Sequence, residues 1–234
     1  GVQSVAKQTS SLALGTNASS IGTNSTAIAV NASANGANSM AIGYFSTSNG
    51  VNSAALSVQA NASGNNSVAL GVFANSQGGN ALAFGTKSIA VGTNSTAISS
   101  NSSATGNNSI SIGVDSQATK TNAQAFGVSA KATGVNATAI SANATASGSN
   151  SIAIGIDSLS SGEDSVAIAA KSKSTAENSL AFGVDAQATA LNTVAIGTQA
   201  ISNQLGALSF GANATATANY TMAFGVGANA NENN

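Results

Sequence analysis

The sequence predicts an all-β protein folded as a β-solenoid of 16 coils of 14 residues each. Three observations lead to this fold class: a fixed 14-residue repeat, an alternation of bulky and small residues within the repeat, and Gly and Asn where repeats join. The first repeat begins at Ser10 and the last ends at residue 233, and no insertion or deletion breaks the register. Because 14 residues are too few for a strand and a helix, each coil is expected to contain two short strands joined by two tight turns.

Each position of the repeat accepts a narrow set of residues. Position 1 is Asn in 12 of the 16 repeats, position 4 is always Ala or Ser, and position 5 is always Ile, Leu or Phe. Position 6 is Gly in 11 repeats, and positions 9 and 11 are always Ala or Ser. Apolar residues in strict columns, in a chain that is 42% hydrophobic, argue against disorder despite the low sequence complexity.

The alternation within a repeat predicts two strands. In residues 66–79 the first strand places Val68 and Leu70 on one side and Ala69 on the other. The second strand has a small side at positions 9 and 11 and a polar side at positions 8, 10 and 12. The segment Gly64–Ser67 joins two repeats as a turn, because Gly and Asn accept positive φ.

The first strand is apolar on both faces, so both faces are expected to be buried. One face must line the roll, and the other then needs a partner outside it. This pattern predicts an oligomer that associates along the first strand. We prefer the assignment that places the bulky column inside the roll and leaves Ala and Gly for close approach between chains. The reverse assignment stays open, since periodicity alone does not decide between them.

Composition excludes several classes of function. The chain has 234 residues, a net charge of −1, no Cys and no His, so thiolate and imidazole metal sites, cofactor sites and the commonest general base are not expected. We therefore do not expect an enzyme. No basic cluster favours nucleic acid, and no apolar run is long enough to insert into a membrane. No charged residue lies at positions 2–7, which places the charges on the outer side of the second strand and in the turns.

The motifs Asn66–Gly71, Asn150–Gly155 and Asn178–Gly183 are each followed by a second half with Ala or Ser at positions 9 and 11, as in Gly127–Gly134. They resemble the head repeats of trimeric autotransporter adhesins, the YadA-like head. The resemblance covers residues 10–233 as a single solenoid domain, with 1–9 as an N-terminal lead-in. It implies a left-handed parallel β-roll and a homotrimer with first strands toward a shared axis. We expect no neck, coiled-coil stalk or membrane anchor within these residues.

The same resemblance implies an adhesin of the type V secretion class on the surface of a Gram-negative bacterium, held in the outer membrane by domains absent from this chain. Its expected partners are extracellular-matrix proteins, host cells or abiotic surfaces, and it is associated with virulence. Two alternatives remain. One is a structural spacer rod without its own ligand. The other is an ice-binding solenoid, for which Thr105, Thr119 and Thr133 share a column that Ser147 and Ser161 interrupt.

Four apolar residues occupy columns that are otherwise polar, and they form the candidate adhesive surface. Phe45 and Phe73 lie at position 8, two coils apart, which corresponds to roughly 9.6 Å at the usual strand spacing. Ile89 and Val91 lie at positions 10 and 12 of the next coil. Exposed aromatic residues are frequent anchors of interfaces, so we expect these four to form a sticky patch.

Overall fold

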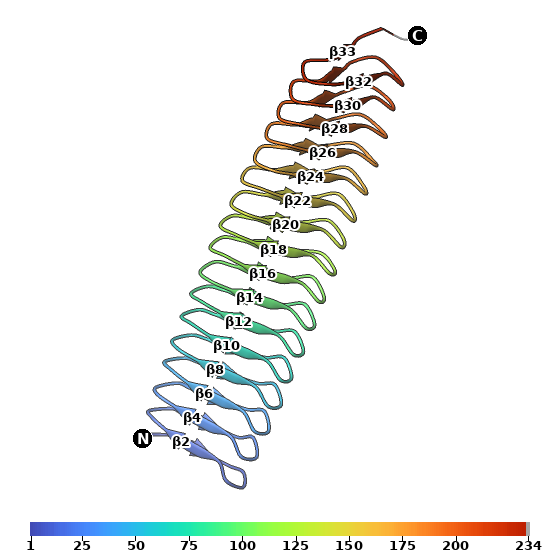
Figure 1. Ribbon diagram of the computed structural model, residues 1–234. Helices are drawn as coiled ribbons and strands as arrows, with labels where there is room; N and C mark the ends of the chain where they lie inside the picture. Colours follow the sequence, from blue (N-terminus) through green and yellow to red (C-terminus); the bar gives the residue numbers. More distant parts are fainter. Residues whose placement is uncertain (233–234) are drawn as a thin grey trace. The chain divides into compact units, whose positions relative to one another are not determined.

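The computed structural model describes residues 1–232, and the chain forms a parallel β-solenoid in which each coil contains one three-residue and one two-residue strand. Its contacts group into two compact units, the N-terminal unit (residues 1–116) and the C-terminal unit (from residue 117). Within each unit the three-residue strands form one parallel sheet, the long-strand sheet, and the two-residue strands form another, the short-strand sheet (Figure 1). The predicted solenoid of 14-residue coils is confirmed.

The long-strand sheet of the N-terminal unit contains β2 (Leu12–Leu14), β4 (Thr26–Ile28), β6 (Met40–Ile42), β8 (Ala54–Leu56), β10 (Val68–Leu70), β12 (Leu82–Phe84), β14 (Thr96–Ile98) and β16 (Ile110–Ile112). Its short-strand sheet contains β1 (Val5–Ala6), β3 (Ser19–Ser20), β5 (Ser33–Ala34), β7 (Thr47–Ser48), β9 (Asn61–Ala62), β11 (Asn75–Ser76), β13 (Ile89–Ala90) and β15 (Ser103–Ala104).

The long-strand sheet of the C-terminal unit contains β18 (Gln124–Phe126), β20 (Thr138–Ile140), β22 (Ile152–Ile154), β24 (Val166–Ile168), β26 (Leu180–Phe182), β28 (Val194–Ile196), β30 (Leu208–Phe210) and β32 (Met222–Phe224). Its short-strand sheet contains β17 (Gln117–Ala118), β19 (Lys131–Ala132), β21 (Thr145–Ala146), β23 (Leu159–Ser160), β25 (Lys173–Ser174), β27 (Gln187–Ala188), β29 (Ile201–Ser202), β31 (Thr215–Ala216) and β33 (Asn229–Ala230).

Strand pairing follows the sequence repeat. β10 pairs with β12 in the register Val68 to Leu82 and Leu70 to Phe84, and β11 pairs with β13 in the register Asn75 to Ile89. Each of these pairs joins residues 14 positions apart, so a residue lies beside its counterpart from the next coil. The columns of the sequence are therefore columns of neighbouring side chains in space.

The interior between the two sheets holds small side chains only. Among the described residues, the buried ones are Ala, Ser, Gly and Thr193. Ala69 and Ala83 of the long-strand sheet pack in one cluster with Ala74 and Ala90, and all four are fully buried. Small residues at positions 4, 9 and 11 thus form the core of every coil.

Our preferred assignment of the first strand was wrong, because the bulky column lies outside and the Ala column lines the roll. Leu70 is 36% and Phe84 46% exposed, whereas Ala69 is completely buried. Strands of two and three residues joined by tight turns hold the sheets close together, and Ala and Ser fill that narrow gap at normal packing density. A branched side chain in the same place would force the sheets apart.

Two positions of each coil turn the chain in the left-handed region. Position 1 does so at Asn66 with φ 56°, and position 8 does so at Asn31 with φ 57°. Asn tolerates this conformation better than other side chains, which explains its frequency at position 1. Position 6 has φ 140° at Gly71, where an added Cβ would clash with the backbone carbonyl of Gly85.

Residues 1–9, expected as a lead-in, take the shape of the second half of a coil. Val5 of β1 pairs with Ser19 of β3 in the register that all later coils follow. A single solenoid domain over residues 10–233 stays a prediction, and its last residue lies outside the described residues. No helix within residues 1–232 is long and apolar enough to cross a membrane.

Candidate interaction surfaces

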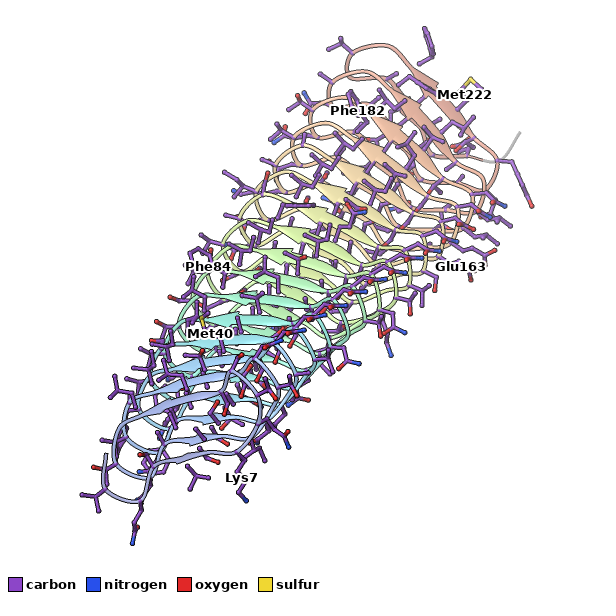
Figure 2. All side chains as sticks on the ribbon, turned by 90° about the horizontal axis from the view of Figure 1, so that it is seen from below. Lys7, Met40, Phe84, Glu163, Phe182 and Met222 are labelled. Carbon is purple, nitrogen blue, oxygen red and sulfur yellow. The ribbon has the colours of Figure 1, made fainter. Side chains whose placement is uncertain are left out.

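The outward face of the long-strand sheet, called here the apolar face, is formed by positions 3, 5 and 7 of every coil. Figure 2 shows these side chains projecting away from the ribbon, with Met40 and Phe84 labelled in the N-terminal unit and Phe182 and Met222 in the C-terminal unit. Phe182 is 50% and Met222 60% exposed. Because alternate residues of a strand point to opposite sides, the buried Ala column at position 4 forces these bulky neighbours outward.

The apolar face is continuous along each unit and carries no charge, since no Asp, Glu, Lys or Arg occupies positions 2–7. A hydrophobic surface that repeats in every coil of a unit is larger than a soluble monomer normally exposes. Surfaces of this kind usually meet another protein, so the expectation of a partner on the outer side of the first strand fits the geometry.

The short-strand sheet has a different outward face. Its side chains come from positions 8, 10 and 12, where Asn, Gln, Ser, Thr and most of the charged residues lie. In the C-terminal unit Asp185, Gln187 and Gln199 line a shallow hollow on this face together with Ile201, Asn213 and Thr215. No group of three or more His, Cys, Asp or Glu that could hold a metal ion occurs within residues 1–232.

Phe45 and Phe73 lie at the turn between the two sheets of the N-terminal unit. They are 46% and 50% exposed, and both adopt the left-handed region, at φ 55° and φ 59°. A bulky residue with positive φ is a backbone outlier and raises the free energy of the fold by about 1 kcal/mol or more. These two phenylalanines therefore combine an unfavourable backbone with exposed aromatic area, and neither property helps the chain to fold.

Ile89 and Val91 project from the short-strand face of the same unit and are 37% and 39% exposed. Ile89 lies beside Asn75 in the β11–β13 pair, and Asn75 follows Phe73 by two residues. The structure thus places Phe73 one coil from Ile89 and Val91, whereas Gln59 separates Phe73 from Phe45 in the position 8 column. All four predicted residues are solvent-accessible.

Tyr44 belongs to the same corner and was missed by sequence reasoning. Its ring meets the ring of Phe45 edge to face, with centroids 4.5 Å apart, and it is 48% exposed. The sequence signal that could have identified Tyr44 is that two aromatic residues are adjacent, at positions 7 and 8 of the same repeat. Tyr44 connects the apolar face with the candidate adhesive surface.

The family described as YadA head domain repeat (2 copies) matches the chain in segments that leave out only residues 57, 75, 99, 141, 169–173 and 201–202. The matched segments are 1–18, 6–28, 15–39, 34–56, 58–74, 76–98, 100–116, 104–127, 118–140, 142–168, 174–200, 203–228 and 216–234.

Among solved structures, the crystal structure of the collagen-binding domain of the Yersinia adhesin YadA is similar at 22% sequence identity. The similarity covers 76% of this chain and 68% of that chain, with a TM-score of 0.31. No curated protein matches the sequence.

Proposed function

This chain belongs to the YadA head domain repeat family, and from that premise we propose that it is the adhesive head of a trimeric surface protein of a Gram-negative bacterium. Its activity is binding rather than catalysis. Three copies associate through the apolar face, and other segments of the protein hold the head at the outer membrane. The partners are an extracellular-matrix protein, a host cell or an abiotic surface.

The observation that carries this proposal is the charge-free apolar face. In the N-terminal unit Leu12, Leu14 and Tyr44 expose 51%, 57% and 48% of their surface, and other coils repeat the pattern. Removal of such area from water contributes roughly 25 cal/mol per Å², so a face of many coils can drive stable association. A parallel copy of the same chain carries the same 14-residue spacing and therefore matches the face coil by coil.

Association through the apolar face leaves the turns and the short-strand face for ligands. The candidate adhesive surface of Phe45, Phe73, Ile89 and Val91 lies there, and Tyr44 borders it at the edge of the apolar face. Residues 8–86 contain no charged residue, and Lys87 follows Phe73 by one coil in the position 8 column. Contacts at this surface therefore depend on aromatic, aliphatic and amide groups beside a single positive charge. A trimer presents the surface three times, and this multiplies weak contacts into avidity.

The test is a trimer that carries Phe45→Ser and Phe73→Ser, assayed against immobilised collagen, fibronectin, laminin, whole cells and polystyrene. We expect binding to fall at least about tenfold while the trimer persists, since hot-spot aromatics contribute about 2 kcal/mol or more each. The matched control is Asn17→Ser with Asn31→Ser, which changes two polar residues of the same column. Full adhesion of the double Phe variant would refute this binding surface, and a parent trimer that binds nothing would favour the spacer.

A further inference from the structure

One residue on the apolar face differs in chemistry from all the others. Positions 3, 5 and 7 of the 16 repeats hold Ile, Leu, Val, Phe, Met, Ala, Tyr, Thr and Ser, and only Gln124 carries an amide. Gln124 opens β18 at position 3, and its side chain is exposed on the same side as Phe126. Within residues 1–232 its amide forms no hydrogen bond to another side chain or to the backbone.

The surroundings of Gln124 in the chain do not explain an amide there. Its neighbour one coil on is Thr138, and Phe126 is paired with Ile140. The corresponding position 3 residues of the following coils are Ile152 and Val166. An amide that lacks a partner within its own chain and lies in an apolar column is unfavourable once the face is covered, unless the covering surface supplies a partner.

A repeating face also creates a problem of register. Two copies that slide by one coil, about 4.8 Å, still place the same columns against each other and lose only one coil of contact. Strands with little distinguishing pattern are prone to such slippage. A closed three-fold assembly needs every copy at the same level, because a one-coil step between successive chains leaves a two-coil mismatch at the third interface.

We propose that Gln124 fixes the axial register of the assembly by forming a ring of amides with the Gln124 residues of two further copies of this chain. In register, each amide can donate one hydrogen bond and accept another at the same level of the axis. Out of register, the same amide faces Thr138 or Ile152 and loses this cyclic pairing. A single buried polar residue that specifies register at a small loss of stability is well established for helical assemblies. This inference rests on the proposed homotrimer.

Cysteine crosslinking tests the register directly, since the chain has no Cys of its own. Val166→Cys and Leu180→Cys mark paired positions of β24 and β26, one coil apart. The two single-cysteine chains are co-expressed, oxidised and digested, and mass spectrometry counts links between like and unlike positions. Disulfides need Cα atoms within about 7 Å, so an offset of one coil changes which positions link.

In the parent we expect disulfides between like positions to be at least about ten times as frequent as disulfides between unlike positions. A ratio of about tenfold is the effect expected from one satisfied network of polar hydrogen bonds. With Gln124→Leu the trimer should persist, and the excess should fall to about threefold or less. Moving the amide two coils, by Gln124→Leu with Ile152→Gln, should restore the parent ratio. Ile152→Leu is the matched control and should leave the ratio unchanged.

The outcomes separate the two proposals. A chain that remains monomeric in light scattering overturns the homotrimer itself. A trimer whose like-to-unlike ratio is the same in the parent and in Gln124→Leu overturns the role of Gln124, as does a trimer in which position 3 forms no interchain disulfide. Loss of register on Gln124→Leu with recovery in the relocated variant supports it.

Discussion

At the scale of single residues, the narrow gap that the turns leave between the two sheets limits the size of the interior side chains. Ala69 is completely buried and packs with Ala62 and Ala74 of the short-strand sheet. Added methyl groups find no space in an interior packed at native density. The space between the sheets therefore restricts position 4 to Ala and Ser.

We expect Ala69→Val to destabilise the folded chain by about 1–3 kcal/mol, the usual cost of overpacking. Leu70→Ala, on the outer side of the same strand, should change the stability of a dissociated chain much less, because Leu70 is already partly exposed. Urea denaturation followed by circular dichroism measures both. Equal effects of the two changes would contradict the placement of the Ala column inside.

Buried serines fall into two groups that offer a matched comparison. The Oγ of Ser53 lies 2.6 Å from Ser48 Oγ and donates at 2.6 Å to the carbonyl oxygen of Gly50. Ser67 occupies the same position 2 one coil later, but its buried hydroxyl has no hydrogen-bond partner. The residue that would face it at position 11 is Ala62, which has no hydroxyl to offer.

Ser53→Ala should therefore cost about 1 kcal/mol, because it removes the hydrogen bonds of the Ser53 hydroxyl to Ser48 and Gly50. The Ser48 hydroxyl keeps an acceptor in the carbonyl oxygen of residue 53, as Ser76 Oγ does in that of Ala81. Ser67→Ala removes an unpaired polar group and should leave the free energy of unfolding unchanged or slightly increased. Thermal unfolding of the two variants beside the parent decides this. A larger loss for Ser67→Ala than for Ser53→Ala would show that the hydrogen bonds of Ser53 are not the source of its stability.

At the scale of elements, the turn at position 1 is reinforced by a ladder of asparagines. In the N-terminal unit each Nδ2 donates to the Oδ1 of the Asn one coil on, at 2.9–3.1 Å, from Asn24 through Asn38, Asn52, Asn66, Asn80 and Asn94 to Asn108. A shorter ladder in the C-terminal unit joins Asn122, Asn136 and Asn150 and ends on the carboxylate of Asp164. These amides join successive coils outside the sheets.

Asn66→Ala should destabilise the chain by about 1–2 kcal/mol, because Ala is unfavourable at positive φ and two ladder hydrogen bonds are lost. Asn66→Gly loses the same hydrogen bonds but accepts φ 56° without strain, so it should be the milder change. The difference between the two, measured by chemical denaturation, isolates the conformational part. Equal losses would assign the whole effect to the ladder.

Most of the strands and turns could be predicted from the sequence. The 14-residue period, the two strands and the turns at Gly and Asn follow from columns such as Asn66 and Gly71. The inside and outside of the first strand could not be predicted, because alternation shows which residues share a face but not which face is enclosed. The width of the interior decides this, and it depends on how tightly the turns at positions 1, 6 and 8 close the coil.

At the scale of the whole molecule, the outward orientation of the bulky column of the first strand changes the role of the surface. With Ala inside, the bulky residues at positions 3, 5 and 7 form the exposed apolar face, which we propose is the contact surface between copies, rather than the core. Phe45, Phe73, Ile89 and Val91 could be located from the sequence because they interrupt polar columns. The edge-to-face contact between the rings of Tyr44 and Phe45 needed the structure, since position 7 belongs to the apolar face and position 8 to the polar column.

The measurement that tests the central claim most directly is the molar mass of the folded chain by light scattering coupled to size exclusion. We expect a species of three times the 22.3 kDa chain mass, because burial of the apolar face stabilises the associated state. A well-folded monomer at the same concentration would contradict the claim that this face is an interface between copies.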